Sequence, residues 1–503
     1  MKRNSTVGSA LGLIDVNGRM GWKAGIACIG LLSGTTVFAG SPASATTYSE
    51  AANTVASSGT DAVEADTKIK AEPVGQWTGL WTRSSLFGDM GGIRSGLGKY
   101  GITLLATETS EYLANLRGGL GQHGDYDGLT TVTLGLDTQK AFGWVGGSFN
   151  ISALNIHGRN LSSDYLGTLN TASGIEAQDT TRLWEMWFQQ SFMDKRFDIR
   201  IGQQSIDQEF MTSTYAATFV NTMFGWPGLP SYDMPNGGPA YPLSALGARV
   251  RAQLTPALSA LAGVYDADPL GNNPANVSGT NFNLHTGAMY IGELQYGINQ
   301  ASDGGMVSDA SAGLPGTYKI GFWYNTARFQ DQRYDANGVS LATSGGDPAS
   351  HRGNYSVYAV ADQMIWRPDP DAPRSIGVFA RVMGAPGDRN LVSVSANVGV
   401  VMKAPFQGRD NDSVGLGLAY IKVGNYAHDL DLDARAAALG GPYGVRTSET
   451  AVEATYQYQA TPWWIIQGDA QYTFNAGAGQ NPNDATKPLR NTFVLGVRTT
   501  VTF

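Results

Sequence analysis

The end of the chain alternates regularly between apolar and polar positions. From residue 493 onward, every second residue is one that a membrane accepts: Phe493, Leu495, Val497, Thr499, Val501 and Phe503. The residues between them are small or polar. Successive side chains of a strand point to opposite faces. The pattern therefore predicts a strand with one apolar face and one mostly wet face.

The two segments before this strand repeat the alternation. They place four polar side chains on one face: Glu453, Gln457, Asp469 and Gln471. A buried strand of a soluble protein would not collect these groups, whereas the wet lumen of a membrane barrel accepts them. The chain also ends on the aromatic Phe503, which is typical of outer-membrane barrels. We therefore expect the barrel assembly machinery to be a partner that reads this last strand.

Sixteen segments share this character, and most have about the ~9–11 residues that a tilted membrane strand needs. They are 102–112, 129–140, 144–157, 182–192, 196–205, 245–254, 257–266, 285–296, 317–328, 353–367, 374–384, 392–403, 411–422, 447–460, 462–474 and 490–503. We therefore predict an all-β fold, a 16-stranded antiparallel transmembrane β-barrel. Apolar residues at helical spacing predict a short N-terminal helix over 84–99.

Short and long connections alternate along the chain, as expected when one barrel rim has tight turns and the other has outer loops. The long links are 113–128, 158–181, 206–244, 267–284, 329–352, 423–446 and 475–489. The link 297–316 is long where a turn is expected. The longest link, 206–244, is rich in Pro, Gly and aromatic residues. It either folds inward to narrow a pore or covers the barrel from outside.

The N-terminus resembles a secretory signal. Basic residues precede an apolar run over 25–38, which is shorter than the ~20 residues of a spanning helix. We predict a signal peptide over 1–39, a flexible mature N-terminus over 40–80, and a porin barrel with its helix over 81–503. An uncleaved anchor is the alternative for the first segment. Cys28, the only cysteine, would leave with the signal peptide.

Charge and composition narrow the function. Without residues 1–39 the chain has 30 Lys and Arg residues and 41 Asp and Glu residues, which gives a net charge of −11. This balance gives no reason to expect a nucleic-acid partner. The five His residues join no nucleophile motif and lack metal-ligand spacing. We therefore expect no enzyme activity, no cofactor and no metal. The alternating acids Asp429, Asp431 and Asp433 have two interpretations. A solvated acidic loop is the favoured one, and a Ca²⁺ site is the weaker alternative.

Several motifs, in their order and spacing, resemble the OprB-like carbohydrate-selective porins. The matching stretches are Leu183-Trp184-Glu185-Met186-Trp187, Arg200-Ile201-Gly202-Gln203, Gly247-Ala248-Arg249-Val250, Lys319-Ile320-Gly321-Phe322-Trp323-Tyr324 and Ala385-Pro386-Gly387-Asp388-Arg389-Asn390. The resemblance covers roughly 80–503 and departs only near the last hairpin, at Gly468-Asp469 and at Asn475-Ala476-Gly477. It implies a monomeric or loosely associated outer-membrane channel through which monosaccharides diffuse. Homo-oligomerisation stays open.

A pore that prefers sugars to ions needs hydrogen-bonding groups of both charges and aromatic surfaces. By parity, the inward candidates for sugar binding at a constriction are Glu111, Glu185, Gln189, Arg200, Arg249, Arg251, Glu293, Trp323 and Arg381; Asp207 and Glu209, at the start of the longest link, are weaker candidates. Each charge has an alternative role, which is only to keep the lumen wet. We expect Glu111 and Arg249 each to be held near mid-pore, with the long link 206–244 closing the lumen toward them.

Two other functions remain as alternatives: a general porin for small polar solutes, and an outer-membrane barrel hydrolase or exported soluble β-protein. Saturable block of ion current by sugar separates a sugar channel from a plain hole. Heat-modifiable migration on a gel separates a membrane barrel from a soluble fold.

We predict that the mature protein begins near Gly40 or Thr46 and contains no cysteine. N-terminal sequencing of outer-membrane material tests this directly. A sequence that still includes Cys28 would contradict the predicted cleavage.

Overall fold

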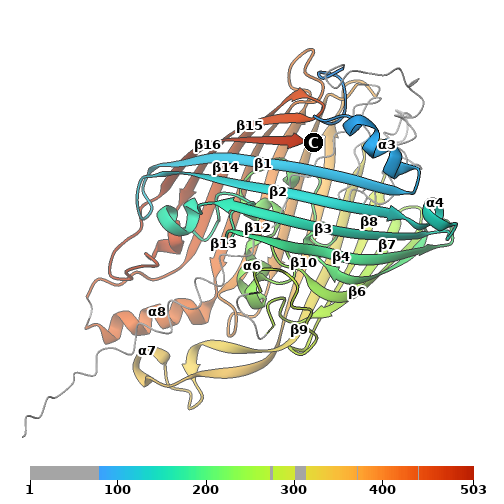
Figure 1. Cartoon of the computed structure of the whole chain (residues 1–503). Coiled ribbons are helices and arrows are strands. Elements are labelled where there is room, and N and C mark those ends of the chain that lie inside the picture. Colours follow the sequence, from blue (N-terminus) through green and yellow to red (C-terminus); the bar gives the residue numbers. More distant parts are fainter. Residues whose placement is uncertain (1–78, 272–275, 301–312, 371, 440) are drawn as a thin grey trace, which may run out of the picture.

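The structure is a computed structural model that describes residues 79–271, 276–300, 313–370, 372–439 and 441–503. Within these residues, sixteen antiparallel strands form a closed barrel in which each strand pairs with its neighbours in sequence (Figure 1). The strands are β1 (Ile102–Arg117), β2 (Gly124–Asp137), β3 (Gly147–Gly158), β4 (Thr180–Phe192), β5 (Phe197–Gln204), β6 (Ala245–Thr255), β7 (Leu258–Asp266), β8 (Ala288–Ile298), β9 (Gly316–Asp335), β10 (Pro348–Trp366), β11 (Ser375–Gly384), β12 (Val392–Lys403), β13 (Ser413–Val423), β14 (Ser448–Thr461), β15 (Trp464–Phe474) and β16 (Thr492–Thr502).

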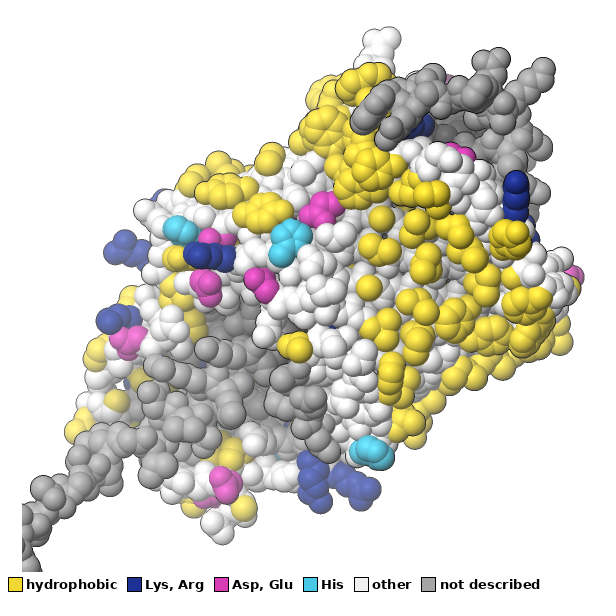
Figure 2. Space-filling view, in the orientation of Figure 1, with side chains coloured by type: hydrophobic (Ala, Val, Ile, Leu, Met, Phe, Trp, Pro, Cys, Tyr) yellow, Lys and Arg dark blue, Asp and Glu magenta, His cyan; other side chains and the backbone are white. Residues whose placement is uncertain are grey.

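The alternation of the sequence becomes an inside and an outside of the barrel. On β9, Ile320 and Phe322 are 63% and 52% exposed, whereas their neighbours Lys319 and Trp323 are buried. Figure 2 shows the outward apolar side chains as a broad band across the strands. The predicted class and all sixteen predicted strands are thus confirmed, and the first and last strands close the barrel by pairing from Thr107↔Thr502 to Arg117↔Phe493.

Two predicted loop lengths were wrong. The first link is residues 118–123 instead of 113–128, because Leu113 and Asn115 continue the inward face of β1. The link between β9 and β10 is 336–347 instead of 329–352, because these strands are 20 and 19 residues long. Their ends therefore rise well beyond the membrane. The link between β8 and β9 stays long, and its residues 301–312 lie outside the described part of the chain.

The N-terminal helix is shorter than the predicted range 84–99. A 3-10 turn η1 (Met90–Gly92) leads into α3 (Ile93–Gly98), and Gly91 and Gly92 between them have φ of 68° and 97°. Glycine tolerates this left-handed backbone, which interrupts a helix. The predicted signal peptide over 1–39, Cys28 and the flexible segment up to residue 78 lie outside the described residues. No helix in the described part is both long and apolar enough to span a membrane.

The N-terminal segment packs on the end of the last strand. The Leu86 N–H donates to the Thr502 carbonyl at 2.8 Å. The ring of Phe87 stacks on Phe503 with centroids 5.3 Å apart, and the Arg94 guanidinium contacts the Phe503 carbonyl. Figure 1 shows α3 and the C-terminus at the same rim, whereas α7 (Leu341–Ser344) and α8 (Asn425–Ala437) lie at the opposite rim.

Two long loops fold into the barrel. The loop between β5 and β6, residues 205–244, contains α5 (Thr222–Gly225) and α6 (Gly228–Asp233), and we call it the pore loop. Its inward course favours the first of the two alternatives given for 206–244, folding into the barrel, over a cover on its outside. The loop between β3 and β4, residues 159–179, also turns inward and buries Leu161, Leu169 and Ile175. We call it the second inward loop, and its position was not predicted.

We predict that Phe503 serves assembly rather than transport. Deleting it should lower the amount of folded barrel in the membrane while export stays intact, because the last strand loses its terminal aromatic side chain. Heat-modifiable migration of membrane fractions measures the folded amount. Phe87→Ala is the matched control, because it removes only the stacking partner. Normal barrel yield after deletion would contradict an assembly role.

Candidate pore constriction

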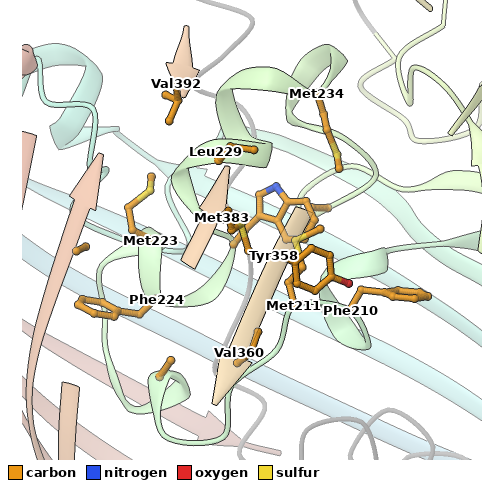
Figure 3. Close-up of a cluster of buried hydrophobic side chains, with 14 of the residues drawn as sticks. Phe210, Met211, Met223, Phe224, Leu229, Met234, Tyr358, Val360, Met383 and Val392 are labelled. Atoms are coloured by element: carbon orange, nitrogen blue, oxygen red, sulfur yellow. The ribbon is translucent and has the colours of Figure 1, made fainter. Parts of the chain in front are cut away.

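The pore loop packs its apolar side chains on one sector of the inner wall. Figure 3 shows Phe210, Met211, Met223, Phe224 and Leu229 against inward residues of the wall: Tyr358 and Val360 of β10, Met383 of β11 and Val392 of β12. This sector is apolar, which corrects the expectation of a wholly wet lumen. Trp323, predicted as a surface for sugar stacking, lies in this cluster and is fully buried. Burial under the loop removes its ring from the lumen.

Two predicted site residues on the wall, Arg381 and Glu293, hold the pore loop by its backbone, and a third, Asp207, links the two ends of the loop. Arg381 donates to the carbonyls of Met211, Met223, Phe224 and Gly225 at 2.6–3.0 Å, and so covers the last carbonyls of α5. Glu293 accepts the Met211 N–H at 2.8 Å and the Tyr358 hydroxyl at 2.9 Å. Asp207 accepts the Ser205 hydroxyl at 2.5 Å and the Tyr241 N–H at 3.0 Å. A backbone group without water needs such a partner.

A second group of predicted residues meets on β4, β5 and β6. Gln189, Arg200 and Arg249 are cross-strand neighbours. Glu209 of the pore loop accepts from Arg249 at 2.5 and 2.6 Å and lies 3.3 Å from Arg200. Asp198 forms a further ion pair with Arg249, which is 0% exposed. Burial alone would raise the pKa of Glu209, but the two guanidinium groups outweigh it and hold that pKa below its usual value.

The remaining two candidates on these strands lie at the edge of this cluster. Glu185 accepts the Ser205 N–H at 3.0 Å, where the pore loop begins. Arg251 stands across from Asp198 in register and is half-buried. The cluster therefore ties the start of the pore loop to the wall, and its charges are largely neutralised by one another.

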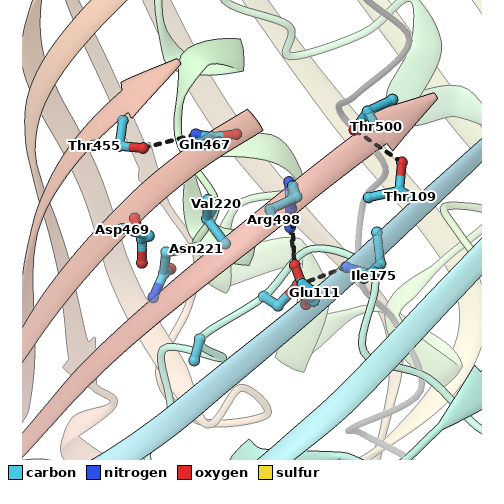
Figure 4. A network of polar contacts seen from close by, with 12 residues as sticks. Thr109, Glu111, Ile175, Val220, Asn221, Thr455, Gln467, Asp469, Arg498 and Thr500 are labelled. Carbon is cyan, nitrogen blue, oxygen red and sulfur yellow. Dashed lines mark hydrogen bonds and ion pairs between the residues drawn. The ribbon is translucent and has the colours of Figure 1, made fainter. Parts of the chain in front are cut away.

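Glu111 lies elsewhere, at the pairing of β1 with β16, which we call the seam. Its Oε2 accepts from the Arg498 Nε at 2.8 Å, directly across the seam (Figure 4). Arg498 also donates to the Ser173 hydroxyl of the second inward loop at 3.0 Å. Glu111 and Arg249 were both expected at one mid-pore constriction, but each pairs with charges close to it: Glu111 with Arg498, and Arg249 with Asp198 and Glu209. They belong to two separate clusters.

One acceptor at the seam is left open. Within the described residues, Glu111 Oε1 is buried and has no hydrogen-bond partner. Asp127, opposite Glu111 on β2, likewise has a buried Oδ2 without a partner. A buried carboxylate oxygen without a donor is costly. These atoms therefore favour a donor group that enters the site, such as a hydroxyl.

A narrow pocket adjoins the seam between the two inward loops. It is lined by Gly174, Ile175, Phe219, Val220, Asn221, Gly225 and Arg498. Glu453 fixes this part of the pore loop by accepting the N–H groups of Val220 and Asn221 at 2.6 and 2.9 Å. The Asn221 side chain donates to Gln471 at 2.9 Å. The pocket thus combines a cation, an amide, backbone groups and an aromatic ring.

The sequence reading missed Arg498, Ser173 and Asn221. Arg498 stands at a polar position of the last strand, but its pairing with Glu111 follows only from the register of barrel closure. Asn221 and Ser173 lie in loops, where no parity applies. The apolar residues of the second inward loop were the one signal that it turns inward.

The acidic stretch over 429–433 is helical and ion-paired. Arg333 of β9 contacts Asp429 at 2.7 Å and Asp433 at 2.9 Å, and Arg446 contacts Asp431 at 2.8 Å. In the described residues no group of three or more potential ligands has the geometry of a metal site. These acids therefore fasten α8 to its surroundings rather than forming an open acidic loop.

Comparisons with known proteins agree on one family. A family model described as carbohydrate-selective porin, OprB family, matches residues 121–503. Porin B of Pseudomonas aeruginosa is 26% identical over 430 residues, which cover 80% of this chain and 88% of that protein. The putative porin QuiX of Acinetobacter baylyi is 26% identical over 424 residues, with 80% and 91% covered. The high-pH structure of Pseudomonas putida OprB is 24% identical, with a TM-score of 0.73 over 84% of this chain and 99% of that one, and supports the fold.

We predict that Arg381→Met loosens the pore loop, because four loop carbonyls lose a charged donor. A loss of roughly 2–4 kcal/mol in loop anchoring is expected. The variant should show higher ion conductance and faster proteolysis within 205–244, measured on the purified barrel. Arg374→Met is the matched control, because Arg374 binds the Pro405 carbonyl outside the loop. Unchanged conductance and proteolysis in Arg381→Met would show that this arginine does not hold the loop.

Proposed function

The chain belongs to the OprB family of carbohydrate-selective porins and is an outer-membrane carbohydrate channel, and we propose that small carbohydrates, monosaccharides among them, diffuse passively through a constriction at the seam. The single observation that carries this proposal is the pocket beside Arg498, enclosed by both inward loops and adjoining the open acceptor of Glu111. The family and the fold point to a channel rather than to an enzyme.

The chemistry of the pocket suits a sugar. A sugar hydroxyl can donate to Glu111 Oε1, which lacks a donor, and a neighbouring hydroxyl can accept from the Arg498 guanidinium. The guanidinium is a planar fork of donors that matches adjacent oxygens. Phe219 and Ile175 offer apolar contact to the ring face of the sugar. An ion would gain little attraction at this point, because the charges of Glu111 and Arg498 neutralise each other.

The arrangement also favours passage over retention. Each hydrogen bond between sugar and wall replaces one with water, so the net gain of each is about 0.5–1.5 kcal/mol. A few such bonds give weak, saturable binding, which is what conduction requires, because a tight site would slow release. The charged groups that hold the pore loop, such as Arg381 and Glu209, are engaged with protein partners. We therefore assign them to shaping the pore rather than to contacting the sugar.

We predict that Glu111→Gln weakens the block of ion current by sugar about tenfold or less. The amide keeps the shape but replaces a charged acceptor by a neutral one, which lowers the strength of the hydrogen bond. Bare ion conductance should change less than sugar block, and anion preference should rise because a fixed negative charge is lost. Single-channel recording with a monosaccharide titration measures all three quantities.

Glu108→Gln is the matched control for this experiment. Glu108 lies three residues earlier on β1 and points outward, where it accepts from Ser110 and Thr130. Its replacement removes the same charge from the same strand without touching the lumen, so sugar block should stay as in the unmodified protein. If Glu111→Gln shows the same sugar dependence as Glu108→Gln, Glu111 is not part of the sugar site. A current that no sugar blocks would instead indicate a general porin.

A further inference from the structure

Two arginines face outward side by side near the outer rim of the barrel. Arg328 on β9 and Arg352 on β10 are directly opposite each other in register, and both are exposed. The register shifts next to this pair, because Asn354 pairs with Asn325, three residues before Arg328, and Gly353 has φ of 79°. Arg328 keeps the outward parity of Tyr324 and Phe322 on β9. Residues paired across two strands share a face, so we place both arginines on the outer face, away from the sugar path.

The pair stands just above the apolar band. Tyr324 and Tyr355 are opposite each other on the same two strands and are 40% and 52% exposed, and below them come Phe322 and Val357. Outward tyrosines mark the level where lipid meets water. Arg328 lies four residues beyond Tyr324, which is about 13 Å along the strand. The long guanidinium side chains therefore reach the headgroup layer. Figure 2 shows basic side chains beyond the edge of the apolar band.

The protein itself does not compensate these charges. Like charges directly opposite each other destabilise a strand pair. The Arg328 Nη1 lies 3.5 Å from the Ser350 hydroxyl, and in the described part of the chain neither guanidinium forms an ion pair with a carboxylate. Arg389, by contrast, contacts both oxygens of Asp388 at 2.8 and 2.9 Å. An external anion would relieve the repulsion between Arg328 and Arg352.

We propose that Arg328 and Arg352 together bind the phosphate group of a lipid in the outer leaflet of the membrane. Two guanidinium forks match the oxygens of a phosphate, and basic clusters next to a membrane span attract anionic headgroups. We expect a lipid rather than a free anion at this site, because the two arginines adjoin the tyrosine pair and the apolar band on the same strands. Acyl chains of the same molecule can lie on Phe322 and Val357.

The test uses the purified full-length mature barrel in a neutral detergent, with native mass spectrometry to titrate bound lipid. The probes are a diphosphorylated lipid A, the same glycolipid without phosphates, and inorganic phosphate as competitor. The double variant R328Q/R352Q should bind the phosphorylated glycolipid roughly ten- to thirtyfold more weakly. The dephosphorylated glycolipid should bind weakly to both proteins. Millimolar inorganic phosphate should not displace the lipid.

Lys422→Gln is the matched control. Lys422 is also exposed and outward at this rim, on β13, but its partners in register are Val394 and Ser448, so no second cation stands beside it. It should bind the phosphorylated glycolipid within about threefold of the unmodified protein. Heat-modifiable migration and sugar block should be unchanged in all variants, because the arginines lie outside the lumen.

Three results would overturn the proposal. Equal lipid binding by R328Q/R352Q and the unmodified protein would show that the pair is not the site. Equal binding of the dephosphorylated glycolipid would show apolar adsorption. Full displacement by inorganic phosphate would show a site for a free anion. Each of these results leaves the sugar channel itself untouched.

Discussion

Closure of the barrel is the constraint on which the rest of the structure depends. In a lipid interior every backbone N–H and C=O must find a partner within the protein, so the first strand has to pair with the last. β1 and β16 do so over residues 107–117 and 493–502. This pairing also brings Glu111 and Arg498 together from positions 387 residues apart in the chain. The ion pair of Glu111 and Arg498, at which we propose the constriction, is thus a product of the same contact that makes the fold possible in a membrane.

The charges inside the barrel serve mainly to order loops. The pore loop and the second inward loop bring many backbone groups into a space with little water, and each buried group needs a partner. Arg381, Glu293, Glu449 and Glu453 supply these partners from the wall; Glu449, for example, accepts the N–H groups of Leu169 and Asn170. A side chain that bonds several backbone groups at once holds a loop without a large apolar core. This explains why so many ionisable groups are buried in a protein that conducts small polar solutes.

Much of the fold was predictable because alternation is a local property. The parity of residues such as Ile320 and Lys319 is visible in the sequence, and segments of this character correspond to all sixteen strands. The site depends on contacts that are not local. Trp323 has inward parity, as predicted, yet it is buried because the pore loop covers it. Arg498 has inward parity too, but its role depends on the register across the seam and on Ser173 of a loop. Parity tells which face a side chain occupies and leaves open what then covers it.

The anchors of the two inward loops also impose an order on maturation. The pore loop belongs to the first half of the chain, but it is held by Glu453 on β14, and the second inward loop is held by Glu449 on β14 and Arg498 on β16. These anchors lie on strands near the end of the chain and are therefore synthesised after both loops. A barrel that still lacks β14 to β16 would leave the second inward loop without these anchors, while the pore loop would keep those from Glu293 and Arg381. The strand that seals the wall thus also supplies, through Arg498, one anchor of the loop beside the proposed constriction.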